Sequence, residues 1–155
     1  MGHFKEAQGD FWEGFQAHMG YTDEELEFFK QKPKLPKIVP KMLNPKLRNS
    51  TLIIEVIKSH GCSEGMKAGD KLYFTGCSLL DTKRSSNWCA YAMFMAGQYA
   101  ALCQNMIIQG LDPNDKYEEN FGCMDCGLEY GWGMIVMTAY VIDESDRNKA
   151  RETGE

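Results

Sequence analysis

The cysteines limit most strongly what this chain can fold into. It has six in 155 residues: Cys62, Cys77, Cys89, Cys103, Cys123 and Cys126. A small secreted protein would use such a set for disulfides. This chain is 43% hydrophobic, which is enough for a core of its own. Its first ten residues are polar and charged, unlike a signal peptide. We therefore expect a cytoplasmic protein whose reduced thiols serve metal ligation, redox or nucleophilic chemistry, or simple burial.

The overall charge argues against one large class of partners. The chain carries 17 basic and 22 acidic residues, a net charge of −5. A nucleic-acid-binding protein of this size is usually basic, so we expect no nucleic-acid partner. No apolar run approaches the roughly 20 residues of a membrane-spanning helix, so we expect no membrane segment.

The first half of the chain predicts two short helices followed by a strap. Thr22 and Glu25 form a capping-box pattern, which predicts the start of the second helix. Residues 31–49 hold four of the five prolines, a spacing that favours an extended strap. Seven basic residues and no acidic one lie between Lys30 and Arg48. This strap could cross an acidic surface of the same protein, or it could contact an anionic partner or substrate.

The second half predicts a small sheet and one long helix. Residues 51–58, 71–75 and 134–142 are rich in strand-forming side chains. Residues 87–109 form a long helical pattern, with Ser86 or Asn87 as its cap and Gly110 as its stop. The prediction is an α+β fold with a small mixed sheet and one long packed helix. We divide it into an N-terminal extension (1–49), a cysteine-containing core (50–143) and a flexible tail (144–155).

The spacing of Cys123 and Cys126 is the most specific local motif. Two thiolates separated by two residues can reach one metal from a tight turn, as in zinc and iron–sulfur sites. Cys89 lies at the start of the long helix, where free backbone N–H groups favour a thiolate. Cys103 lies about 21 Å further along the same helix at 1.5 Å per residue, so it cannot share that site and is expected in the core.

The remaining ligands must come from isolated positions. Cys62 follows a predicted strand in a turn that contains glycine, which is a common setting for a ligand. Cys77 and His60 are reserve ligands. The preferred set is Cys62, Cys89, Cys123 and Cys126, and four thiolates suit a [4Fe–4S] cluster, with zinc as the alternative. Asp125 lies within the Cys123–Cys126 turn and Glu129 follows it, either as hydrogen-bond acceptors for the ligands or as surface charges.

An ordered set of residues in the second half resembles a small bacterial and archaeal family of largely unassigned function. That family is marked by a G-x-C-x2-G-x-K-x-G-D segment, a cysteine that starts a helix and a late Cys-x-Asp. The resemblance covers residues 51 to 142, and it is carried by Cys62, Gly65, Lys67, Gly69, Asp70, Cys89, Cys123 and Asp125. The first glycine of the family segment departs from the pattern, because Gly61 directly precedes Cys62. It implies that Cys62, Cys89 and Cys123 are the shared cysteines and that Cys77 and Cys126 are additions. Met66 stands where the family often has histidine.

These observations leave three functional hypotheses. The first is a metal- or iron–sulfur-binding accessory subunit of a redox or lyase enzyme. The second is an enzyme in its own right that uses an open metal position or Cys89 as a nucleophile. The third is a non-catalytic assembly module with buried cysteines. In each case residues 1–49 are expected to contact a protein partner or a second copy of the chain.

Overall fold

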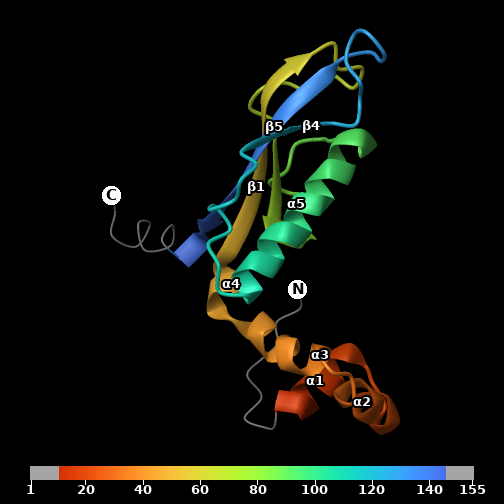
Figure 1. Cartoon of the computed structure of the whole chain (residues 1–155), viewed down its shortest axis with the longest axis vertical. Coiled ribbons are helices and arrows are strands. Elements are labelled where there is room, and N and C mark those ends of the chain that lie inside the picture. The colour runs from red at the N-terminus through yellow and green to blue at the C-terminus, as the bar shows by residue number, and fades with distance from the viewer. Residues whose placement is uncertain (1–10, 146–155) are drawn as a thin grey trace. The chain divides into compact units, whose positions relative to one another are not determined.

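The computed structural model describes residues 11–145 and divides the chain into two compact units, Met1–Asn44 and Pro45–Glu155 (Figure 1). The predicted flexible tail lies almost entirely outside the described residues. No helix within residues 11–145 has the length and apolar character needed to cross a bilayer.

The N-terminal unit is built on an aromatic cluster between two helices, α1 (Phe11–Met19) and α2 (Asp23–Lys30). The predicted capping box is present: the Glu25 backbone N–H donates to Thr22 Oγ1 (3.2 Å), and the Thr22 N–H donates to Glu25 Oε2 (2.8 Å). The helices bury their apolar faces against each other, in a cluster of Phe15, Leu26 and Phe29 surrounded by Phe11, Trp12, Tyr21 and Val39.

The predicted extended strap is wrong, because the proline-rich segment folds into short helical turns. These are α3 (Leu35–Ile38), the 3-10 helix η1 (Val39–Leu43) and α4 (Pro45–Asn49). Each of these helices has a proline in its first turn, where the backbone N–H has no acceptor within the helix in any case. Prolines spaced this closely end each helix after four or five residues, but they do not prevent it from starting.

The second unit is a five-stranded sheet with the order β3-β2-β1-β5-β4. Its strands are β1 (Ser50–His60), β2 (Lys71–Thr75), β3 (Leu79–Leu80), β4 (Asn120–Gly122) and β5 (Met134–Asp143). All four pairings within the described residues are antiparallel, so the sheet is not the mixed sheet that we predicted. The α+β class itself is confirmed.

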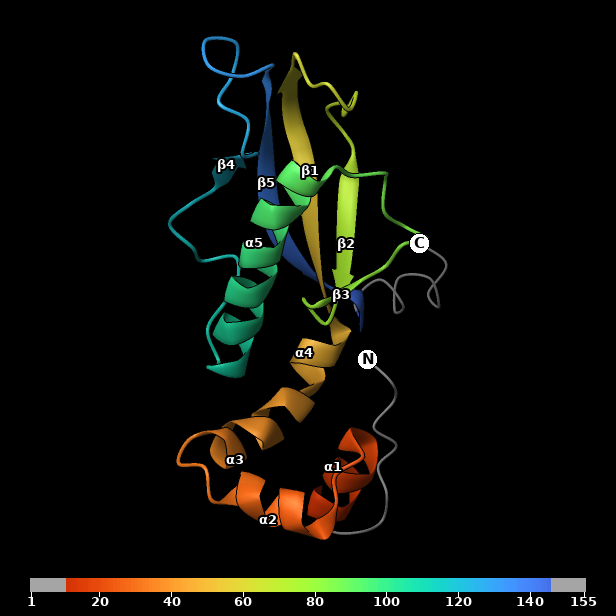
Figure 2. The same cartoon turned by 90° about the vertical axis from the view of Figure 1, so that its right-hand side faces the viewer.

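One long helix, α5 (Ala90–Ile108), covers one face of the sheet (Figure 2). Its buried residues recur at helical spacing, and they include Cys103, which we expected in the core: Ala92, Ala96, Ala100, Cys103 and Ile107. The small alanines let the helix lie close to the strands. Gly110 ends it with a left-handed φ of 81°, as expected.

The start of α5 differs from the prediction. Cys89 is the N-cap, not Ser86 or Asn87. The reason lies in the sheet, because the serine hydroxyls before the helix serve β2 instead. Ser86 Oγ accepts a hydrogen bond from the Lys71 N–H (3.2 Å), and Ser85 Oγ accepts one from the Tyr73 N–H (3.0 Å).

The core extends to α4, which belongs to the second unit. Leu47 of α4 is 1% exposed and packs in the same cluster as the inner side chains of β1, β2, β5 and α5. The boundary between the two units therefore lies at residue 44, five residues before the end of the predicted extension.

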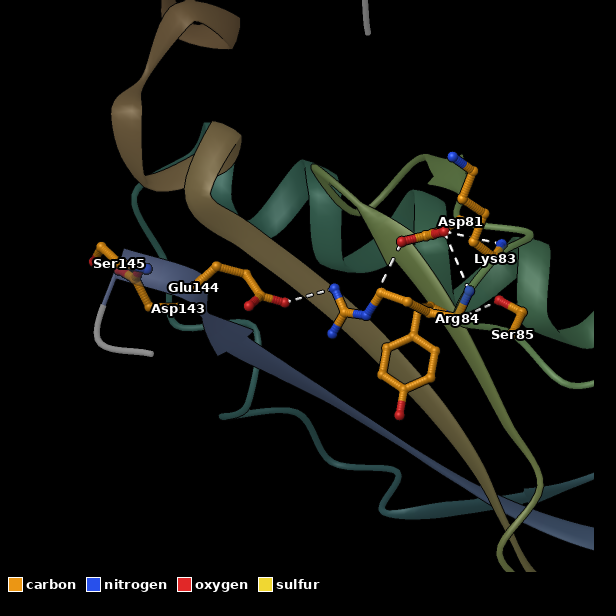
Figure 3. Close-up of polar contacts among 8 residues, drawn as sticks. Asp81, Lys83, Arg84, Ser85, Asp143, Glu144 and Ser145 are labelled. Atoms are coloured by element: carbon orange, nitrogen blue, oxygen red, sulfur yellow. Dashed lines mark hydrogen bonds and ion pairs between the residues drawn. The ribbon is translucent and has the colours of Figure 1, made fainter. Parts of the chain in front are cut away.

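A group of polar contacts ties the segment after β3 to the end of β5 (Figure 3). Arg84 Nη1 pairs with Glu144 Oε1 at 2.9 Å, and its guanidinium lies 4.4 Å from the centroid of the Tyr73 ring. Asp81 Oδ1 accepts hydrogen bonds from the backbone N–H groups of Lys83 (3.0 Å) and Arg84 (3.3 Å). These contacts fix the segment that leads from β3 toward the start of α5.

Candidate functional site

Strand register places Cys62 and Cys123 at the same end of the sheet. His60, the last residue of β1, pairs with Met134, the first residue of β5. Cys123 follows β4, and its N–H donates to the Ile135 carbonyl (3.2 Å). Both cysteines are half-buried and pack against the core cluster to which Ile135 belongs.

The direction of α5 brings Cys89 toward that same end. The last turns of α5 lie beside α4, which immediately precedes the start of β1 (Figures 1 and 2). The first turn of α5 therefore points toward the end of β1, where Cys62 follows. Cys89 is half-buried against the same core cluster, and its side chain makes no capping hydrogen bond.

The three thiols share one end of the core, yet they are not gathered into a closed site. Among residues 11–145, no three His, Cys, Asp or Glu side chains lie close enough together to hold a metal ion. Cys126 is exposed on the loop after β4. The ligand set of Cys62, Cys89, Cys123 and Cys126 thus remains a prediction.

The other two cysteines are core residues. Cys77 and Cys103 are both fully buried in the main cluster. Burial raises the pKa of the Cys77 thiol to about 12, and the nearby Cys103 thiol adds to this effect. Burial also raises the pKa of Cys103. These thiols remain protonated at neutral pH, which fits a packing role.

His60 lies on the opposite face of the sheet from Cys123. It lines a hollow of about 370 Å³ together with Lys58, Met134 and Val136. The side chains on either side of Ile135 in β5 thus face this hollow, while Ile135 itself faces α5. Cys123 packs on the α5 side, so this reserve ligand and the thiols are separated by the sheet.

Several residues of the recognised motif have structural explanations. Gly61, Gly65 and Gly69 all have left-handed backbones, with φ of 67°, 69° and 96°. Asp70 Oδ2 accepts a hydrogen bond from the Lys67 N–H (2.8 Å) and closes the turn before β2. The turn thus accounts for the glycines and Asp70, whereas the Lys67 side chain is exposed and the Cys62 side chain is half-buried against the core.

Asp125 organises the loop that carries Cys126. Its Oδ1 accepts hydrogen bonds from the backbone N–H groups of Gly127 (3.1 Å), Trp132 (3.2 Å) and Gly133 (3.4 Å). A carboxylate held by three backbone donors is a loop anchor. Glu129, on the same loop, is exposed. The loop in turn meets the end of β1, since a Cβ on Gly61 would lie 2.6 Å from the Trp132 carbonyl oxygen.

The indole of Trp88 is a further candidate group, which no sequence pattern indicated. Its Nε1 is buried and has no hydrogen-bond acceptor among the described residues. Such buried donors are rare in folded proteins and point to an acceptor that residues 11–145 do not supply. Trp88 directly precedes Cys89. A buried indole N–H without an acceptor cannot be predicted from a tryptophan beside a cysteine, because the burial of the N–H depends on the packing of the whole domain.

No family model, no curated protein and no solved structure matches this chain. The resemblance to the cysteine-motif family thus stays an expectation from the residues themselves.

Proposed function

We propose that this protein binds a metal centre, a [4Fe–4S] cluster in preference to zinc, through Cys62, Cys89 and Cys123, with Cys126 as the fourth ligand. One observation carries the proposal: half-buried cysteines from three separate segments pack against one hydrophobic core, and strand register puts two of them, Cys62 and Cys123, at the same end of the sheet. Buried structural cysteines, such as Cys77 and Cys103, instead lie deep in that core.

The chemistry of the surrounding groups supports this choice. Thiolates are soft ligands that suit iron–sulfur clusters and zinc. The buried Trp88 N–H adds a donor without an acceptor beside Cys89, and N–H donors to thiolate or sulfide sulfur are a common feature around clusters. Since the thiols are not gathered in the described residues, binding requires them to approach each other. The exposed Cys126 is on the segment best placed to complete the set.

An accessory role fits this site better than independent catalysis. Asp125, the carboxylate within the Cys123–Cys126 turn, accepts three backbone hydrogen bonds, so its place in the structure is explained by the loop that it shapes. A centre closed by four thiolates carries electrons or stabilises a fold, whereas a centre with three leaves one iron position open to a substrate. The role of Cys126 therefore decides between the first two hypotheses.

Metal analysis of protein purified without oxygen tests the proposal. We expect iron and acid-labile sulfide with visible absorption, or else zinc in a colourless protein. Cys62→Ser, Cys89→Ser and Cys123→Ser should each lose most of the bound metal, whereas Cys103→Ala should keep it as the matched core control. A folded, metal-free wild-type protein that shows six free thiols once it is denatured would refute the proposal.

The N-terminal unit supports the expected protein partner for such a subunit. Leu35 and Ile38 are 44% and 37% exposed, and they lie within the segment that has seven basic and no acidic residues. An apolar strip among lysines suits an acidic protein surface. In protein purified from its natural source, Leu35→Ser with Ile38→Ser should release the partner. Unchanged co-purification at both low and high salt would contradict this assignment.

A further inference from the structure

Helix α5 is the longest helix of the fold, and its outer face has an unusual composition. The chain is 25% charged, yet Ala90–Ile108 contains no Asp, Glu, Lys, Arg or His. On the side away from the sheet, Tyr91 is 62% exposed, Phe94 is 57% exposed and Leu102 is 40% exposed. A helix that is apolar on both faces is normally covered on both. The described residues of the second unit cover only one (Figures 1 and 2).

The outer side chains are arranged symmetrically about Gln98. Phe94 and Leu102 lie four residues before and after it, and Tyr91 and Asn105 lie seven residues before and after it. These spacings of three, four and seven place all five side chains on one helix face. The structure leaves each of them exposed.

We propose that this face binds a second copy of the same chain, with two antiparallel α5 helices crossing at Gln98. In that arrangement Phe94 packs against Leu102 of the second copy, and Tyr91 faces its Asn105. Each contact occurs twice, as a two-fold axis requires. The two Gln98 amides meet at the axis, where each can donate to and accept from the other. One central polar pair of this kind fixes the register of paired helices.

The absence of charge favours a second copy over other occupants. A face with no ionised group offers no complement to the basic segment of residues 30–48 or to any strongly charged partner. Antiparallel helices also bring opposite ends of the two helix dipoles together.

The size of the face predicts a weak dimer. A helix of 19 residues is about 28 Å long at 1.5 Å per residue. A single pair of such helices buries less than the roughly 800 Å² per partner of a standard interface. Association should therefore be measured at about 100 μM protein, near the micromolar range of small interfaces.

Charge exchange at Gln98 is the decisive experiment on the full chain. Sedimentation equilibrium should give the wild type twice its mass of 17.6 kDa. Gln98→Glu and Gln98→Lys should each weaken the dimer at least about tenfold, because like charges then meet at the axis. An equimolar mixture of the two variants should dimerise again. Only a residue that faces its own copy gives this pattern.

Matched controls and second variants keep the result interpretable. Tyr117→Glu and Tyr117→Lys introduce the same charges at a side chain that is 96% exposed and outside α5, and they should leave the dimer intact. Phe94→Ser should weaken it as much as the Gln98 variants, with unchanged far-ultraviolet circular dichroism.

A monomeric wild type would overturn the proposal, as would a dimer that survives both Gln98 variants. Loss of the dimer without recovery in the mixture would point to a different occupant or register, such as the N-terminal unit, and would also overturn it. None of these outcomes depends on the metal content of the protein.

Discussion

The close approach between the end of β1 and the start of β5 can be measured with two glycine substitutions. Gly61 and Gly65 have nearly the same left-handed φ, 67° and 69°, within the same motif. They differ in their surroundings. A Cβ on Gly61 would lie 2.6 Å from the Trp132 carbonyl oxygen and 3.2 Å from Gly133 Cα, whereas a Cβ on Gly65 would meet nothing within 4 Å.

The comparison isolates the effect of that contact on the free energy of unfolding. Gly65→Ala should lower this free energy by about 1 kcal/mol, the usual effect of placing a Cβ in the left-handed region. Gly61→Ala bears the same strain and must also displace backbone atoms of Trp132 and Gly133, which adds about 1–3 kcal/mol as overpacking does. The expected difference between the two variants is thus about 1–3 kcal/mol.

Urea unfolding followed by tryptophan fluorescence and circular dichroism provides the assay. At a typical slope of about 1.5 kcal/mol per M urea, the midpoint of Gly61→Ala should fall at least about 0.7 M below that of Gly65→Ala. Equal midpoints would show that the turn after β1 does not press on the loop that ends at Gly133. The basis for placing Cys62 near that loop would then be lost.

Three further measurements test the packing and the electrostatics. Leu47→Ala should lower the free energy of unfolding of the second unit by about 3 kcal/mol, because Leu47 is fully buried in its core. Leu43→Ala lies in the N-terminal unit and serves as the control, so it should leave the urea midpoint of the second unit unchanged. The hydrogen bond from Lys71 lowers the pKa of Glu55. The ionised carboxylate therefore stabilises the fold above its unfolded pKa, near 4.3, and this stabilisation is lost as the pH falls through the lower folded pKa. Glu55→Gln should be about 0.5–1 kcal/mol less stable than the wild type at pH 7, and the difference should shrink below pH 4. Burial raises the pKa of Cys77 to about 12, so the folded protein holds this thiol proton more tightly than the unfolded chain, whose thiol pKa is near 8.5. The free energy of unfolding of the wild type should therefore fall by roughly 1–2 kcal/mol between pH 8 and pH 10. Cys77→Ala should show a flatter pH profile in the same urea titrations.

Local sequence patterns predicted most of the secondary structure. The β-branched residues of β1 and β5 and the capping box at Thr22 depend on neighbours in the chain, so they can be read without tertiary information. The small-residue face of α5 and the burial of Cys103 follow from helical periodicity in the same way. The prolines misled the prediction because their effect depends on position within a helical turn, which their spacing along the chain does not specify.

The candidate site could be predicted only in part. Spacing selected Cys62, Cys89, Cys123 and Cys126; the first three pack against one core, whereas Cys126 is exposed. The start of α5 at Cys89 and the isolated N–H of Trp88 could not be predicted, because both depend on which groups pack against or hydrogen-bond to the preceding segment.

The sequence by itself determined which residues of β1 are apolar, and only the tertiary structure decided which face each side chain joins. Up to Val56 the even-numbered residues face α5, in register with β5. The register then shifts between Val56 and Lys58, so that Ser59 pairs with Ile135 and His60 pairs with Met134. A single extra residue in one strand turns every later side chain to the other face. That shift puts His60 on the face opposite Cys123, and it arises from pairing with a strand more than seventy residues away in the chain.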